Sequence, residues 1–315
     1  MLTSCGKQHT RQMLDESNAV YYWRTDFLLD STERAFLRQY HVQKVYCRYF
    51  DVVMGDDGEP KPNATITFSD TLPDGIELIP TVYITEDCMH QSRPGLAEKI
   101  VKRIIQMNET NDIQGVREIQ IDCDYTSKSR KTYYNFLEQL FTVYSLSSCV
   151  PAVASGKAER TDDNPTTSEG FANKSTVNCK PSTVNRTVST TIRLHQLSMP
   201  APPVDYGVLM VYNTGDPRNF MERNPILDYR DVYPYLDRLD KYPLPLAAAY
   251  PVYQWVRNIH GVRVEHTVEA QEILRVKKAM EVERPDLSRT IITYHLNKDN
   301  INRYNPQTYE EIYHH

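Results

Sequence analysis

The stretch of sequence that decides the fold is Arg117-Glu118-Ile119-Gln120-Ile121-Asp122-Cys123-Asp124-Tyr125. Apolar and polar residues alternate along it, and a period of two is typical of a β-strand. One face therefore carries Gln120, Asp122 and Asp124. The opposite face carries Ile119, Ile121 and Cys123. Polar groups within a buried strand cost free energy unless they line a wet cavity or bind a ligand, so we interpret them as a site.

Seven further segments have the composition of strands, and helical patterns lie between them. The eight predicted strands are residues 19–23, 44–53, 78–85, 118–125, 190–197, 207–212, 244–250 and 290–296. Alternating strands and helices predict parallel βα units, and eight such units fit a closed barrel of about 250 residues. The predicted fold class is therefore α/β, a TIM-type (β/α)8 barrel formed by one domain, residues 18–315. An open doubly wound sheet is the alternative, although no GxGxxG or Walker sequence supports it.

Helix signals occupy the segments between these strands. A capping box, Asp30-Ser31-Thr32-Glu33, precedes the first predicted helix. Apolar residues repeat at helical spacing over 96–107 and 133–144, and helices are also predicted over 228–239 and 269–282. Residues 259–262 indicate a hairpin after the seventh strand.

A polar segment, residues 147–188, lies between the fourth helix and the fifth strand. It is rich in Ser, Thr, Asn and Lys and has no periodicity, which predicts a long disordered insertion. Of the six cysteines, Cys149 and Cys179 flank this segment and could form a disulfide in an oxidising compartment. No CxxC pair or Cys/His ligand spacing occurs, which argues against a zinc site.

The sequence Leu2-Thr3-Ser4-Cys5-Gly6 resembles the lipobox of bacterial lipoprotein precursors, in which the cysteine is acylated. A charged start and an apolar run normally precede this motif, and neither is present here, so either the true start lies upstream and has been trimmed or the match is by chance. We predict a lipoprotein tether over residues 1–17 with a lipid anchor on Cys5. This places the protein in the bacterial cell envelope, on the periplasmic or outer-membrane face. No segment of 18 or more apolar residues occurs, so the anchor is the only predicted membrane attachment.

The charge and the aromatic content narrow the class of ligand. A net charge of −5 and a pI near 6.0 give no basic field, so nucleic acid is not a predicted partner. The chain has 22 Tyr against 8 Phe and 2 Trp. Tyrosine suits surfaces that stack on sugars, but it also suits half-buried positions in a barrel.

Ligands of such barrels bind at the carboxyl ends of the strands, so we take polar and aromatic residues there as candidates. The candidates are Trp23, Arg24, Asp26, Arg48, Asp51, Asp122, Asp124, Tyr125, Arg193, His195, Tyr212, Asn213, Tyr250, Tyr253 and Trp255. The aromatic members either form a platform for sugars or pack within the barrel.

Three motifs among these candidates resemble those of a known family. They are Asp122-Cys123-Asp124-Tyr125, Met210-Val211-Tyr212-Asn213 and Ala249-Tyr250-Pro251-Val252-Tyr253. They are similar to the D-x-D-x-E-Y, M-x-Y-D and G-x-P-x-Y signatures of chitinase-like family 18 glycoside hydrolases. Their order along the chain and the strands on which they lie also match. Two phrases, Gln120 to Asp124 and Ser189-Thr190-Thr191, also resemble an uncharacterised family of bacterial barrel proteins, often lipoproteins, for which no activity is implied.

The resemblance to the glycoside hydrolases implies roles for three residues. Asp124 takes the position of the general acid, Asp122 that of the residue that orients the substrate acetamide, and Tyr212 that of the residue that stabilises the cyclised intermediate. In that family the acetamide of the substrate is the nucleophile. The sequence departs from the family where Gln120 and Asn213 replace aspartates, and where Asp124 is one methylene shorter than glutamate. A shorter acid must still reach the leaving oxygen.

The residues by themselves leave several interpretations open. Asp122 and Asp124 lie two residues apart, about 6.5–7 Å between Cα atoms, so each can raise the pKa of the other as in acid–base machinery. Alternatively they pair with Arg193 or Arg48 in a structural network. His195 is a base or orienting group, a metal ligand beside the two acids, or a histidine satisfied at the barrel mouth. Because no second histidine accompanies it, we predict no metal ion at this site. We also predict no cofactor.

The sequence thus predicts a glycosidase-like barrel of the cell envelope that binds a glycan and, if active, hydrolyses it. The predicted catalytic residues are Asp122, Asp124 and Tyr212. The predicted substrate-binding residues are Trp23, Tyr125, Arg193, His195, Asn213, Tyr250 and Trp255. The alternative function is a non-catalytic glycan-binding lipoprotein with a degenerate glycosidase site.

Overall fold

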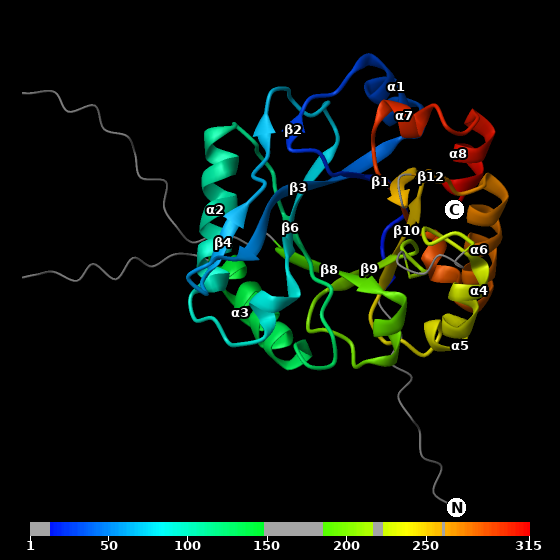
Figure 1. Ribbon diagram of the computed structural model, residues 1–315. Helices are drawn as coiled ribbons and strands as arrows, with labels where there is room; N and C mark the ends of the chain where they lie inside the picture. Colours follow the sequence, from blue (N-terminus) through cyan, green and yellow to red (C-terminus); the bar gives the residue numbers. More distant parts are fainter. Residues whose placement is uncertain (1–12, 148–184, 217–222, 260–261) are drawn as a thin grey trace, which may run out of the picture.

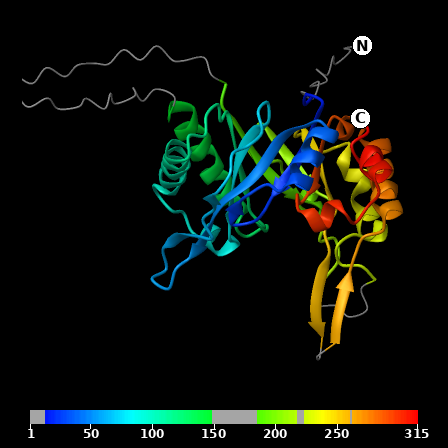
Figure 2. The ribbon, with the colours of Figure 1, turned by 90° about the horizontal axis from the view of Figure 1, so that it is seen from above.

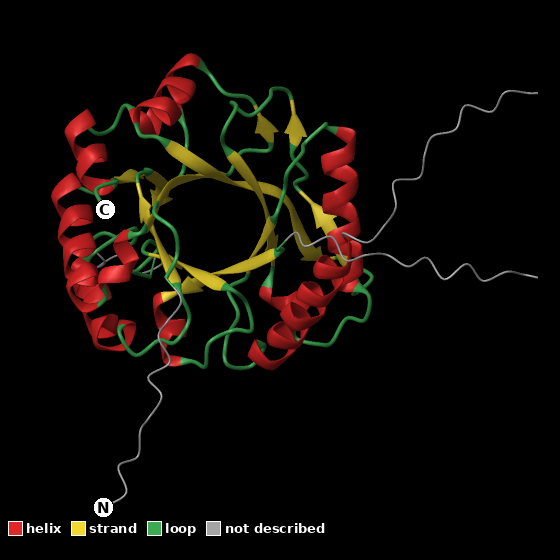
Figure 3. Cartoon of the chain, turned by 180° about the vertical axis from the view of Figure 1, so that it is seen from behind, coloured by secondary structure: helices red, strands yellow, loops and turns green. Residues whose placement is uncertain are grey.

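A computed structural model describes residues 13–147, 185–216, 223–259 and 262–315. Eight parallel strands form a closed ring with helices around its outside (Figure 3). The order around the ring is β1, β3, β6, β7, β8, β9, β10 and β13, and pairing of β13 with β1 closes it. The predicted (β/α)8 barrel is therefore confirmed, and the open sheet was the wrong alternative.

All eight predicted strands are present. The barrel strands are β1 (Ser17–Tyr22), β3 (Val42–Met54), β6 (Glu77–Ile84), β7 (Glu118–Asp122), β8 (Thr187–Arg193), β9 (Tyr206–Met210), β10 (Leu246–Pro251) and β13 (Thr290–Tyr294). The outer pairs of strands are β4 (Pro60–Asn63) on β3, β2 (Asp26–Phe27) with β5 (Thr67–Phe68), and the predicted hairpin β11 (Trp255–Ile259) with β12 (Val262–His266). The hairpin projects away from the barrel (Figure 2).

Helices follow the predicted segments (Figure 1). The α-helices are α1 (Ser31–Gln39), α2 (Leu96–Thr110), α3 (Arg130–Leu146), α4 (Tyr229–Val232), α5 (Leu236–Leu239), α6 (Ala270–Glu283), α7 (Lys298–Ile301) and α8 (Pro306–Ile312). Short 3-10 helices are η1 (Glu86–Met89), η3 (Leu194–Ser198), η4 (Tyr233–Tyr235) and η5 (Pro285–Ser288). None of the described helices is long and apolar enough to cross a membrane.

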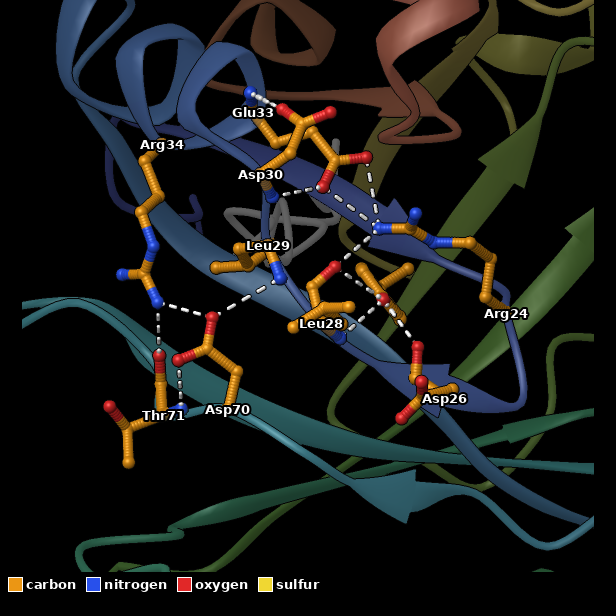
Figure 4. A network of polar contacts seen from close by, with 10 residues as sticks. Arg24, Asp26, Leu28, Leu29, Asp30, Glu33, Arg34, Asp70 and Thr71 are labelled. Atoms are coloured by element: carbon orange, nitrogen blue, oxygen red, sulfur yellow. Dashed lines mark hydrogen bonds and ion pairs between the residues drawn. The ribbon is translucent and has the colours of Figure 1, made fainter.

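The predicted capping box at α1 is confirmed. The Asp30 carboxylate accepts a hydrogen bond from the Glu33 backbone N–H at 2.8 Å, and the Glu33 carboxylate accepts one from the Asp30 N–H at 3.1 Å. Figure 4 shows that Arg24 also reaches Glu33, at 2.9 Å. Asp26 accepts a hydrogen bond from Ser69 at 2.6 Å. Arg24 and Asp26, two of the strand-end candidates, therefore hold the loop after β1 in place.

Several predicted strands end earlier than expected, among them β7 and β8. β7 ends at Asp122 and β8 at Arg193, so Asp124 and His195 lie in the connections that follow. Gln196, which is fully buried, explains the early end of β8. Its side chain accepts the Arg193 N–H at 2.8 Å and donates to the Tyr125 carbonyl at 2.9 Å, which ties the two connections together. The strand predicted over 190–197 therefore does not include His195, because η3 begins at Leu194.

The two faces predicted for β7 are confirmed. Ile119, Ile121 and Cys123 are completely buried. Gln120 faces the interior of the barrel, where it accepts a hydrogen bond from the Tyr21 hydroxyl of β1 at 2.8 Å. TIM-barrel interiors are usually filled by branched apolar side chains, so this interior is unusually polar.

Several predictions concern residues outside the described ranges. These are Cys5, most of the tether 1–17, most of the insertion 147–188, and the pair Cys149 and Cys179. The edges of the two segments do fall in described residues. Ser17 belongs to β1, and Thr187 and Val188 belong to β8.

Candidate functional site

The carboxyl ends of β7, β8 and β9 surround a hollow of about 280 Å³, which we call the carboxyl-end hollow. Ligand sites usually measure roughly 300–1,000 Å³, so it is at the small end of this range. Its lining residues are Asp124, Arg193, Leu194, His195, Met210, Tyr212, Asn213, Thr214 and Tyr235. Five of these were predicted from the sequence as site residues, and the fold brings all five together.

One guanidinium group joins the two predicted acids. Arg193 Nε lies 2.5 Å from Asp124 Oδ1, and Arg193 Nη2 lies 3.5 Å from Asp122 Oδ1. Its remaining terminal nitrogen contacts the Met210 sulfur. Arg48, the other predicted partner, instead binds Asp51, with Nε 2.7 Å from Oδ1. The structural network that the sequence left as an alternative therefore exists, and Arg193 is its centre.

The two acids differ in their access to solvent. The Asp122 side chain is 4% exposed and accepts a further hydrogen bond from the Thr191 hydroxyl at 2.6 Å. Burial raises the pKa of Asp122, the charge of Asp124 adds to this, and the Arg193 guanidinium opposes it. The Asp124 side chain is 50% exposed and lines the carboxyl-end hollow. A ligand in the hollow therefore meets Asp124 and not Asp122.

His195 reaches the same hollow from η3 and is exposed. Partial burial lowers its pKa, Arg193 acts in the same direction, and Asp124 opposes both. Within the described ranges, no group of three or more His, Cys, Asp or Glu side chains is placed to hold a metal ion. The interpretation of His195 as a metal ligand with the two acids therefore has no support from the geometry.

Tyr212 and Asn213 form the wall contributed by the segment after β9. Tyr212 is almost fully buried, and its ring stacks on Tyr294 with 4.6 Å between centroids. Its hydroxyl has no hydrogen-bond partner among the described residues. Asn213 has a left-handed backbone with φ of 53°, and its Oδ1 accepts a hydrogen bond from the Tyr253 hydroxyl at 2.6 Å. This wall therefore contains one fixed amide and one tyrosine whose unsatisfied hydroxyl is itself buried.

Similar folds are found in solved enzymes with very different sequences. The spore cortex-lytic enzyme SleL of Bacillus cereus is 13% identical over 96% of this chain and 74% of that chain, with a TM-score of 0.51. For SleL of Bacillus megaterium QM B1551 the identity is 9%, over 96% and 75%, with a TM-score of 0.56. The class V chitinase of Nicotiana tobaccum is 10% identical over 94% and 99%, with a TM-score of 0.53.

This likeness shows the fold alone. No protein-family model and no curated protein sequence matches the chain. The barrel is therefore built like those of chitinase-like proteins, and the chemistry of its own site must come from its own residues.

Two predicted substrate-binding residues do not reach the carboxyl-end hollow. Tyr125 is fully buried and stacks on Tyr133 of α3, with 4.9 Å between centroids. Tyr250 is also fully buried, and Glu281 of α6 is close enough to contribute to the rise in its pKa that burial causes. The prediction is wrong for both because their side chains face the outer helices.

Two other aromatic candidates lie near the barrel mouth without lining the hollow. Trp23 packs on Tyr21 and Tyr294, each with 5.7 Å between centroids, and the Arg48 guanidinium lies 5.6 Å from the Trp23 ring. Trp255 begins β11 and is partly buried. Neither residue lines the hollow.

Sequence reasoning missed several residues that shape the site. Thr191 and Tyr294 continue the inward alternation of predicted strands, so the period of two was a signal for both. Tyr235 lies in η4, outside any strand, and no pattern in the sequence pointed to it.

Proposed function

We propose that this protein is a glycan-binding barrel whose ligand occupies the carboxyl-end hollow beside Asp124. The observation that carries the proposal is the Arg193 guanidinium that holds Asp122 and an accessible Asp124 together. Fixed, charged acceptors form hydrogen bonds about twice as strong as neutral ones, and sugar hydroxyls supply the matching donors. The fixed Asn213 amide adds a polar group, and Tyr212 adds apolar surface to the lining.

Binding is better supported than hydrolysis because the two properties of a general acid are divided between two residues. A general acid needs a raised pKa and must also reach the leaving oxygen. Asp122 has the raised pKa but is buried. Asp124 has the access, but its carboxylate already accepts from Arg193.

Hydrolysis is the second candidate function, with Asp124 as the acid. One observation favours hydrolysis. The buried acid Asp122, whose pKa is raised, lies next to the accessible acid Asp124, as in acid–base pairs. Asp122 would then orient the substrate and Tyr212 would stabilise the intermediate, as the resemblance to family 18 implies.

A panel of N-acetylated and neutral oligosaccharides tests both functions with the purified protein. We expect at least one member to raise the melting temperature without releasing a product. Asp124→Ala should weaken that binding roughly 10- to 150-fold, because the loss of a hydrogen bond to a charged group costs about 1.5–3 kcal/mol. Asp124→Asn should weaken binding less than Asp124→Ala does, because the amide oxygen still accepts a hydrogen bond although it carries no charge.

Glu109→Gln, at an exposed acid on α2, is the control and should change nothing. Product release that Asp124→Asn abolishes would favour hydrolysis. If no sugar of the panel binds or is cleaved, both functions are wrong.

We further propose attachment to the cell envelope through an acylated Cys5, supported by the sequence Leu2 to Gly6. The chain enters the barrel at Ser17, at the amino end of β1, whereas the hollow lies at the carboxyl ends of the strands. A tether on Cys5 would therefore join the barrel at the end opposite the hollow.

In cells of the source organism, the wild type should fractionate with membranes and carry the mass of acyl chains. Cys5→Ala should move to the aqueous fraction, and Ser4→Ala should behave as the wild type. Wild-type protein with an unmodified Cys5 would disprove the anchor.

A further inference from the structure

The amino ends of the strands open into a second cavity of about 490 Å³, which we call the amino-end cavity. It is lined by Met13, Leu14, Asp15, Lys44, Glu118, Phe141, Asn185, Arg186, Thr187, Asp205, Tyr206, Pro245 and Thr290. Glu118, the first residue of β7, is only 4% exposed there. Asp122 lies four residues further along the same strand, about 13 Å away. The cavity is therefore separate from the carboxyl-end hollow.

Among the described residues, hydrogen bonds to the Glu118 carboxylate reach one of its two oxygens only. Its Oε1 accepts from the Ser189 hydroxyl at 2.6 Å and from the Tyr206 hydroxyl at 2.5 Å. Tyr206 is held in turn by Tyr46, with 2.5 Å between the two oxygens. The other carboxylate oxygen, Glu118 Oε2, lies 4.0 Å from Lys44 Nζ, which is beyond hydrogen-bond distance. One oxygen is thus fixed, and the other has a cation near it but no close donor among the residues that the structure describes.

The charges around the cavity leave Glu118 incompletely compensated. Burial raises the pKa of Glu118 to about 7, although Lys44 and the two hydroxyl donors oppose the rise. Burial also raises the pKa of Asp205. Arg186 directs Nη1 to the Val116 carbonyl at 2.8 Å and to the Tyr144 hydroxyl at 3.0 Å, away from Glu118.

The outer walls of the amino-end cavity are largely apolar. Met13, Leu14, Phe141 and Pro245 contribute to them, and the Phe141 side chain is 38% exposed. A ligand that fits both parts of the cavity has a hydrogen-bond-donating cation at one end and a short apolar chain at the other.

We propose that the amino-end cavity binds a small primary alkylammonium ion, whose ammonium group donates to Glu118 Oε2 while its alkyl chain packs on the apolar walls. An ammonium group offers three donors and forms charge-assisted hydrogen bonds with a carboxylate. A metal ion fits less well, because the described residues contain no cluster of three or more ligating side chains.

Calorimetric titration of the full chain with n-butylammonium chloride at pH 8 tests the proposal. We expect saturable binding, and at least tenfold weaker binding of n-butanol and of butyrate, which match the chain length without the positive charge. Glu118→Gln should weaken butylammonium binding at least tenfold. Asp124→Asn should leave it unchanged, so this test succeeds or fails independently of the glycan site.

The pH dependence of butylammonium binding separates a site at Glu118 from weak contacts elsewhere. Affinity should rise from pH 6 to pH 8 as Glu118 becomes charged. Charged or titratable groups facing Glu118 are Lys44 and Tyr46 on β3, Glu77 on β6, Tyr21 on β1, Tyr144 on α3 and Tyr206 on β9. Burial raises the pKa of the four tyrosines further above 10, so they stay neutral in this range.

Phe141→Ser, on the partly exposed wall, provides a second variant if Glu118→Gln does not fold, and it should weaken binding several-fold. The proposal is overturned if the wild type does not bind butylammonium, if the affinity is flat between pH 6 and pH 8, or if a folded Glu118→Gln protein binds as the wild type does.

Discussion

Arg193→Met should lower the free energy of unfolding by about 3–5 kcal/mol, the usual cost of leaving a buried charge without its partner. Methionine is unbranched and fills much of the same space, so the loss comes mainly from the charge. Asp122 would keep only its hydrogen bond from Thr191. Urea denaturation followed by circular dichroism measures the effect.

The double variant Arg193→Met/Asp122→Asn distinguishes loss of charge pairing from loss of packing. Asparagine is neutral, so the buried charge disappears and most of the lost stability should return. If the double variant is as unstable as Arg193→Met alone, Arg193 acts through packing rather than through its ion pair with Asp122.

The instability of Arg193→Met should also depend on pH. Without the guanidinium, the pKa of Asp122 in the folded protein rises further above its unfolded value of about 3.9. Consider a carboxyl group whose pKa is higher in the folded protein than in the unfolded chain. At a pH below the pKa of the unfolded chain it does not destabilise the fold, and its destabilising effect grows as the pH rises towards its pKa in the folded protein. Arg193→Met should therefore be closest to the wild type near pH 4 and furthest from it at pH 8. The double variant should lack this extra dependence.

Arg284→Ala is the second change for which we expect a large effect, again about 3–5 kcal/mol. Arg284 follows α6 and is fully buried. It donates to the carbonyls of Leu239, Tyr242 and Leu244 at 3.2, 3.1 and 2.7 Å, and lies 3.2 Å from Asp286. Alanine would leave these carbonyls without this donor and open a cavity.

Arg263→Ala is the matched control for Arg284→Ala. Its ion pair with Glu265, at 2.8 Å, lies on the surface of the β11–β12 hairpin. Exposed pairs contribute about 0–1 kcal/mol, so this variant should be nearly as stable as the wild type in urea. Equal stability losses for Arg263→Ala and Arg284→Ala would show that the buried contacts of Arg284 carry no special weight.

The fold was predictable because each barrel strand carries its own local pattern. The alternation of residues 118–124 correctly placed Gln120 and Asp122 on one face of the strand and Ile119 and Ile121 on the other. The ends of the strands were less predictable. At the end of β8, the Gln196 side chain accepts the hydrogen bond of the Arg193 backbone N–H and donates to the Tyr125 carbonyl, and this contact between two connections forms only in the folded chain.

The sequence predicted part of the lining of the site, but not the contacts between its residues. Sequence spacing brought Asp124, Arg193 and Tyr212 to the same end of the barrel. It left Arg193 and Arg48 as equal candidates for the acids, because the choice depends on which side chains are neighbours in space. Tyr125 and Tyr250 were misplaced because an aromatic residue near a strand end can face either the barrel mouth or the outer helices.

The role of Glu118 was also missed, although it lies in the stretch that decided the fold. It shares the inward face with Gln120 and Asp122, but it stands at the amino end of β7, where ligands of such barrels are not usually expected. Its burial, its unequal hydrogen bonding and the cavity beside it are properties of the folded barrel.

A crystal structure with the oligosaccharide that gives the largest thermal shift would decide whether the carboxyl-end hollow is the glycan site. We predict a sugar ring in the hollow, with one hydroxyl about 2.5–3.0 Å from an Asp124 carboxylate oxygen and the ring in contact with Tyr212. A sugar bound elsewhere on the barrel, with no contact to Asp124, would contradict the proposed function.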